Sequence, residues 1–204
     1  MNIKEKIMNL FLEHIEKYNN IQKHKVFISF HHQNDEKYKI KLEKLAQENN
    51  TEFISKAIQD GDINENLETD RIYQIIRDDY IADSTVTIVL IGKDTWKRKY
   101  VDWEIASSLR DTRNNPRNGL VGILLPTYNN ISYNFEHLNF TTDKEKYFCK
   151  NTIPPRLWDN FNHNNQNERY AEIYSWNYAI THLKEIIDEA FKKRKKTNNL
   201  NQKG

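Results

Sequence analysis

The feature that most constrains the fold is a run of apolar and β-branched residues at positions 85–92 (TVTIVLIG). A run that is apolar on both faces is typical of a strand buried in the middle of a parallel sheet. Gly92 ends the run, and a helix begins within the next few residues (TWKRKYVDWEI, 95–105). A strand that enters a helix through a short polar loop places that loop at the carboxyl edge of the sheet, where open α/β folds bind ligands. Glu104, in the first turns of this helix, can therefore point into a ligand-binding crevice.

The rest of the chain alternates between predicted strands and helices. Apolar runs predict strands at 26–30, 51–55 and 120–125, and apolar residues at helical spacing predict helices between them. An amphipathic pattern over 3–15 predicts an added N-terminal helix, and the spacing over 173–191 predicts one long C-terminal helix. Strands that alternate with helices indicate an α/β fold with a doubly wound parallel sheet.

Length and composition limit the organisation. A chain of 204 residues is long enough for one such domain with additions. We expect an N-terminal helix and connection over 1–22, the domain over 23–191 and a basic, disordered tail over 192–204. The single cysteine, Cys149, excludes an intramolecular disulfide. No apolar run approaches the roughly 20 residues of a membrane span, and the N-terminus lacks the apolar core of a signal peptide, so we expect a cytoplasmic protein with no membrane partner.

Positive charge is concentrated at the C-terminus. Residues 192–204 carry six Lys and Arg side chains and no acidic one, so the formal net charge of +2 becomes −4 without them. A mildly acidic body argues against a nucleic-acid-binding surface on the folded domain. The basic tail can be a solvated helix end that aids solubility, or it can contact RNA or an acidic partner.

Several common ligand-binding motifs are absent from the sequence. It contains neither G-x-G-x-x-G nor G-x-x-x-x-G-K-[ST], and with only five glycines it cannot build a glycine-lined phosphate cradle. A response-regulator receiver needs an acidic pair after its first strand, where this chain has Phe30, His31 and His32. Adjacent histidines diverge and rarely chelate one ion, so we expect no metal site.

The position of Glu104 on its helix suggests chemistry. At about 100° per residue, Val101, Ile105 and Leu109 face the sheet, and Glu104 lies at the margin of that face. A carboxylate there is expected to be partly desolvated yet open to the crevice, which raises its pKa and suits it to stabilise a developing cation. The alternative is a surface glutamate that stabilises the first helical turn through the helix dipole.

Aromatic residues surround this carboxylate in the sequence. Trp96, Tyr100 and Trp103 can stack on the base or ring of a ligand. Packing in the core or at its rim explains Trp96 and Trp103 equally well. The polar residues 31–35, after the first predicted strand, are expected to form a loop in the wall of the same pocket.

Three segments in this order resemble a known family. They are VFISF at 26–30 followed by a histidine, STVTIVLIG at 84–92, and an aromatic-Val-x-x-Glu-Ile pattern at 100–105. Together they resemble the TIR-like proteins of bacterial Thoeris antiphage systems, the ThsB group. The resemblance covers residues 25–126, about half of the chain.

This resemblance implies a flavodoxin-like, TIR-like fold and an activity. Many TIR domains cleave the nicotinamide–ribose bond of NAD, and their helix-borne catalytic glutamate corresponds to Glu104. Phe30 and His31 would line the substrate pocket, and residues 56–68 would occupy the place of the loop that gates NAD. NAD is then a substrate, with no further cofactor. Members of the ThsB group sense infection, which suggests a phage-derived activator, and make an ADP-ribose-derived signal, often cyclic, that activates a separate effector.

Two other functions remain compatible with the sequence. A TIR-like interaction scaffold would assemble partners without catalysis. The long polar segments 56–68 and 127–167 are predicted to be irregular, and such loops can serve as interfaces as well as lids. A nucleotide sensor would bind NAD without releasing nicotinamide. The apolar faces of the terminal helices can pack on the domain itself or on a second copy in a homo-oligomer.

Overall fold

A parallel sheet forms the centre of the molecule. The computed structural model describes residues 5–8, 24–47, 52–54, 58, 61–112, 115–128, 150–161 and 169–195. Within these residues five strands form one sheet in the order β2-β1-β3-β4-β5, and every neighbouring pair is parallel. The strands are β1 (Lys25–Ser29), β2 (Glu52–Ile54), β3 (Val86–Ile91), β4 (Gly119–Leu124) and β5 (Glu172–Ser175). The predicted α/β, doubly wound fold is confirmed.

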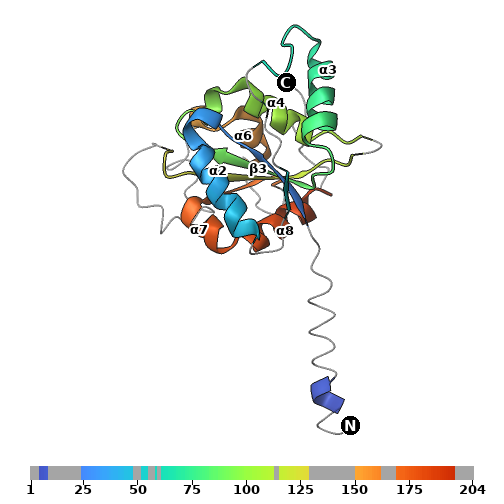
Figure 1. Cartoon of the computed structure of the whole chain (residues 1–204), viewed down its shortest axis with the longest axis vertical. Helices are drawn as coiled ribbons and strands as arrows, with labels where there is room; N and C mark the ends of the chain where they lie inside the picture. The colour runs from blue at the N-terminus through green and yellow to red at the C-terminus, as the bar shows by residue number, and fades with distance from the viewer. Residues whose placement is uncertain are drawn as a thin grey trace.

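Helices cover both faces of the sheet (Figure 1). Buried residues of α2, α7 and α8 form one apolar cluster with one face, and those of α3, α4 and α6 form two clusters with the other. The helices are α2 (His32–Gln47), α3 (Thr69–Ile75), α4 (Lys99–Ser108), α6 (Pro155–Phe161), α7 (Trp176–Thr181) and α8 (Leu183–Lys193). Shorter helical segments are the π-helical η1 (Ile76–Tyr80) and the 3-10 segments η2 (Thr95–Lys97) and η4 (Lys150–Thr152).

The central strand is β3, as its composition predicts. All six of its residues are buried, and it pairs with β1 on one side and β4 on the other. A strand covered on both faces needs apolar side chains in both directions, which is why β3 lacks the alternation of a half-exposed strand.

Alternation along β1 directs its side chains to the two faces. Val26 and Ile28 belong to the apolar cluster under α2 and α8, whereas Phe27 packs on the opposite face beside α3 and α4. Since successive strand residues point to opposite faces, Ser29 points the same way as Phe27. A polar side chain thus lies in the interface between the sheet and α4.

The strand order creates a ligand-binding position. The chain winds outward from β1 to β2 in one direction and from β3 through β5 in the other, so the order reverses between β1 and β3. In open α/β sheets the crevice at such a switch point, at the carboxyl ends of the strands, is where ligands bind. Ser29 ends β1 at this crevice, and α4 follows β3 there.

The C-terminal part differs from the prediction of one long helix over 173–191. Residues 172–175 instead form β5, which pairs with β4, and two helices follow it. The Ser175 hydroxyl accepts a hydrogen bond from the Tyr178 backbone N–H and so caps α7. His182, outside helical geometry, separates α7 from α8. The prediction of one helix was wrong because the helical spacing of apolar residues runs without a break through one strand and two helices.

Two polar segments also differ from their prediction as loops. Helix α2 begins at His32, so most of the expected loop at 31–35 is helical. Helix α6 lies in the segment 127–167, which was expected to be irregular. The expectation for residues 56–68 agrees better, because the described part of that segment, residue 58 and 61–68, contains turns and no regular element.

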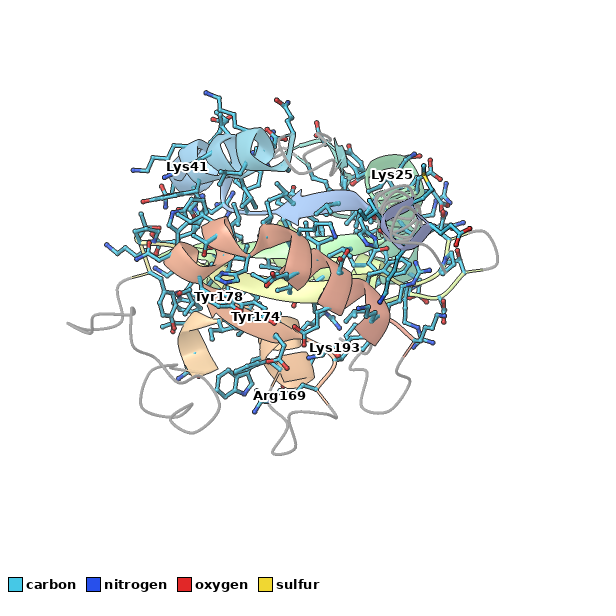
Figure 2. The ribbon with its side chains drawn as sticks, turned by 90° about the horizontal axis from the view of Figure 1, so that it is seen from below. Lys25, Lys41, Arg169, Tyr174, Tyr178 and Lys193 are labelled. Carbon is cyan, nitrogen blue, oxygen red and sulfur yellow. The ribbon has the colours of Figure 1, made fainter. Side chains whose placement is uncertain are left out.

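The predicted terminal segments are described only in part. Residues 5–8 are helical, and the rest of the predicted N-terminal helix and connection over 1–22 lies outside the described residues. At the other end, α8 includes the first two residues assigned to the tail. The Lys193 ammonium lies 2.6 Å from Glu172 Oε1, which joins the end of α8 (Figure 2) to β5. The tail from 196 onward lies outside the described part of the chain.

Candidate active site

A cavity of about 320 Å³ lies at the switch point of the sheet. Its walls come from the segments that follow β1, β2 and β3, so the carboxyl edge of the sheet forms its floor. The described residues that line it are Phe30, His32, Gln33, Glu36, Ile58, Arg98, Tyr100, Val101 and Glu104. Of the six predicted site residues, the structure brings Phe30, Tyr100 and Glu104 together here.

Of the described acidic side chains that line the cavity, that of Glu104 is buried. Its side chain comes from the middle of α4 and is only 4% exposed, although we expected a more open position at the helix margin. The difference arises because α4 is covered on more than its sheet-facing side. α3 and α6 contact it as well, and Ser107, one turn after Glu104 on the same helix, is fully buried.

The Glu104 carboxyl is held by one hydroxyl. Ser29 Oγ, fully buried at the end of β1, donates a hydrogen bond to Glu104 Oε2. Burial raises the pKa of Glu104 to about 8, and the hydrogen bond from Ser29 opposes that rise. Near neutral pH the carboxyl is therefore largely protonated.

Phe30 and His32 form the wall that follows β1. Phe30 is buried in the cluster under α2, and its ring centroid lies 4.2 Å from that of His32. Burial lowers the pKa of His32, which favours the neutral imidazole. His31, which we expected in the wall, is buried but does not line the cavity, and its backbone carbonyl accepts the Asp35 N–H in the first turn of α2. Since α2 begins directly after His31, the neighbouring histidine faces the cavity instead.

Tyr100 connects the cavity to the segment at 61–68. Its hydroxyl donates a hydrogen bond of 2.9 Å to Glu65 Oε1, and the Lys99 ammonium lies 3.1 Å from Glu65 Oε2. The hydrogen bonds from Tyr100 and Lys99 lower the pKa of Glu65, which keeps this carboxylate charged. Ile58, from the start of the same polar segment, lines the cavity. This part of the predicted 56–68 segment thus contributes to the wall and is tied to α4.

The two tryptophans lie outside the cavity lining. Trp103 is 7% exposed and packs with Phe27 and other buried residues, with its ring edge-on to Tyr100. Trp96 is 39% exposed on η2, and the Lys97 ammonium lies 5.2 Å from the centre of its ring. Of the two roles considered for them, the structure gives Trp103 core packing and places Trp96 at the surface.

Several residues of the site, in the lining or in contact with it, were not singled out from the sequence. Ser29 carries a detectable signal, because it is a polar residue in an apolar strand on the side of Phe27. The side chains from α2 are hidden by the expectation of a loop there, although helical spacing from His32 brings Glu36 to the same face. Arg98 precedes α4 and adds a guanidinium to the cavity wall.

The site has the groups to bind an organic ion with an aromatic ring. Phe30 and Tyr100 offer ring faces and edges, Glu104 offers a negative charge once it loses its proton, and Arg98 offers a positive one. Among the described residues, no group of three or more His, Cys, Asp and Glu side chains is arranged to hold a metal ion. Nor does the described part of the chain contain a helix with the length and apolarity to cross a membrane.

The fold and the site together define a flavodoxin-like α/β domain with a carboxyl group at its switch point. Over residues 27–130 the chain matches the family described as Thoeris protein ThsB, TIR-like domain. This region is half of the chain and includes all of the described residues that line the cavity. The chain therefore belongs to this family of TIR-like proteins associated with Thoeris systems. A search of curated proteins finds no match to the chain.

Proposed function

We propose that this protein consumes NAD, cleaving the bond between nicotinamide and ribose through Glu104. The observation that carries the proposal is the buried Glu104 carboxyl in the wall of a cavity at the switch point of the sheet. A buried carboxyl outside an ion pair destabilises a fold, because the charged form loses its hydration. An interaction scaffold has no use for such a group, whereas a site that generates a cation does.

The reaction needs little beyond this carboxylate. When the bond between ribose C1′ and the nicotinamide nitrogen breaks, the electron pair leaves with neutral nicotinamide and an oxocarbenium ion remains on the ribose. A carboxylate beside the ribose stabilises that charge in the low-dielectric cavity. Capture by water, which loses a proton, gives linear ADP-ribose. Capture by a nucleophile of the ADP-ribose itself, when water is excluded, closes a ring.

The substrate itself can provide the active state of Glu104. The carboxyl is largely protonated at neutral pH because burial raises its pKa to about 8. NAD carries a positive charge on its nicotinamide ring, and an adjacent cation favours the carboxylate. Binding is thus expected to release the proton from Glu104. Phe30 and Tyr100 in the wall are suited to stack on the nicotinamide ring.

The family suggests the fate of the ADP-ribose after cleavage. We propose that the product is an ADP-ribose-derived signal, cyclic rather than linear, that diffuses in the cytoplasm to a separate effector. A phage-derived activator and assembly into a homo-oligomer are part of the same proposal. The apolar wall around Glu104, with Phe30, Ile58 and Val101, supports the exclusion of water that ring closure requires.

The experiment incubates the purified full chain with NAD, with and without lysate from phage-infected cells, and separates the products by mass-resolved chromatography. We expect nicotinamide release that is lost in Glu104→Gln and retained in Glu43→Gln, which removes a carboxylate from α2 outside the cavity. The mass of the second product distinguishes cyclic from linear ADP-ribose. No loss of NAD under either condition would favour the scaffold, and bound but intact NAD would favour the sensor.

A further inference from the structure

We infer that Ser29 is a positioning residue for Glu104, holding Oε2 of the carboxyl and turning Oε1 toward the cavity. The inference deepens the proposed function, and it rests on that function for its catalytic meaning only. The contact that carries it joins residues 75 positions apart, at the end of β1 and in the middle of α4. Both side chains are buried, so neither hydrogen-bonds freely to bulk water.

The location of Ser29 explains why the pair is specific. Because side chains alternate along β1, Ser29 points into the interface with α4. Phe27, two positions earlier, points to the same face and is apolar. A hydroxyl buried there without a partner would destabilise the fold, and the Glu104 carboxyl is the partner it has. The Ser29 hydroxyl and the Glu104 carboxyl thus hydrogen-bond to each other across an otherwise apolar interface, and this contact restrains the rotamer of each side chain.

The hydrogen bond also fixes the direction of the carboxyl. Glu104 lines the cavity while its Oε2 accepts the Ser29 hydroxyl, so Oε1 is the oxygen available to a ligand. A freely rotating carboxyl would have to be ordered when the transition state forms, whereas one already held is preorganised for the cation. Ser29 therefore acts through Glu104 and needs no contact with the substrate.

The same hydrogen bond favours the charged form of the carboxyl. A hydroxyl that donates to a carboxylate stabilises the anion, so it counteracts the effect of burial on the Glu104 pKa. Among the described residues, five other polar or charged groups line the cavity: His32, Gln33, Glu36, Arg98 and Tyr100. They are unchanged by substitution at Ser29, so a shift in the titration of Glu104 reports the loss of its hydroxyl partner.

The structure offers a matched control on the same helix. Ser108, near the end of α4, shares a hydrogen bond of 2.7 Å with the Thr87 hydroxyl of β3. This pair also joins the sheet to α4 through buried hydroxyls, and neither residue lines the cavity. The Ser108 hydroxyl also donates a hydrogen bond of 2.8 Å to the backbone carbonyl of Glu104. Ser108→Ala therefore removes a buried hydroxyl that contacts the Glu104 backbone and leaves the Glu104 carboxyl with its Ser29 partner.

The test is a pH titration of Glu104 in the full chain labelled with ¹³C at the glutamate carboxyl carbons. The Glu104 signal is identified by its loss in Glu104→Gln. In Ser29→Ala we expect its midpoint to rise by about one to two pH units, the shift that corresponds to a hydrogen bond to a charged group. In Ser108→Ala the midpoint should stay at the wild-type value. Ser29→Cys, a weak donor of similar size, should fall between wild type and Ser29→Ala.

An unchanged midpoint in Ser29→Ala, or an equal shift in Ser108→Ala, would overturn the inference. Because the readout needs no catalysis, it also separates this inference from the proposed function. A shifted midpoint in a protein that leaves NAD intact would retain Ser29 as the residue that positions Glu104 and reject NAD cleavage. If NAD is cleaved, the acid limb of kcat/KM should move to higher pH in Ser29→Ala by the same amount as the midpoint.

Discussion

At the scale of single residues, the most unusual feature is the Glu104 carboxyl, which is buried, lines a cavity and has no cation beside it. Glu172 is also buried, but it lies in ion pairs with Lys193 and Arg169, two residues that Figure 2 labels. Asp35 is held by the hydroxyls of Thr95 and Thr127 and does not line the cavity. For Glu104, burial is the largest influence on its pKa, and a single hydroxyl opposes it. Such a group lowers the stability of the fold at high pH and makes sense as part of a functional site.

Replacement of this carboxyl should therefore stabilise the protein. The Glu104 pKa is about 8 in the fold against an ordinary 4.5, so between these values the folded state holds a proton that the unfolded state has lost. As pH rises from 4.5 to about 8, the contribution of Glu104 to the free energy of unfolding therefore falls by about 5 kcal/mol in total. Glu104→Gln, a neutral side chain that can still accept from Ser29, should be more stable than wild type at pH above about 8.

Urea unfolding of wild type and Glu104→Gln across this pH range measures the effect. The difference between the two proteins cancels the contributions of all other titrating groups. We expect the difference to grow in favour of the variant as pH rises and to level off above the Glu104 pKa. Parallel stability curves would mean that Glu104 titrates normally, against the burial that the structure gives it.

At the scale of elements, close contacts at the carboxyl edge hold β3 to α2. Asp35, fully buried in α2, accepts hydrogen bonds from Thr127 at 3.1 Å and Thr95 at 3.5 Å. Gly92, directly after β3, lies so close that a Cβ on it would be 2.3 Å from Asp35 Oδ2. Position 92 therefore has no room for a side chain beside Asp35, and a glycine there allows α2 to approach the switch point.

Gly92→Ala should consequently destabilise the protein. The added methyl group forces α2 or the Asp35 side chain to move, which we expect to cost about 1–3 kcal/mol in the free energy of unfolding. In an Asp35→Ala background the same substitution should cost clearly less, because the atoms it collides with are gone. Chemical unfolding of the four proteins provides the measurement. Equal costs in both backgrounds would contradict the proposed contact.

The sequence predicts these elements unequally. β3 is recognisable because a strand buried on both faces must be apolar throughout. β5 has four residues, and Ile173 continues the helical spacing of Trp176 and Ile180, so the pairing with β4 that makes it a strand is hidden in tertiary structure. The hydroxyl of Ser175, which caps α7, is the local signal that a helix begins there rather than earlier.

At the scale of the whole molecule, topology converts these local features into a site. The order β2-β1-β3-β4-β5 brings the ends of β1 and β3 to one crevice, and the residues that come after both strands line it. The sequence predicts the crevice and its carboxylate from the strand–loop–helix pattern. It does not predict the contact of Ser29 with Glu104 or the displacement of His31 by His32, because both depend on where α2 and α4 settle against the sheet.

The most direct test of the account is the pH dependence of nicotinamide release. Purified full chain, supplied with NAD and with lysate from phage-infected cells, is followed from about pH 6 to about pH 9 beside Glu104→Gln, a range that brackets the pKa of the buried carboxyl. We predict that release by the wild type rises with pH as Glu104 loses its proton and that the variant releases none above background. Release by Glu104→Gln at the wild-type rate would contradict the account, because the buried carboxyl would then have no part in the reaction.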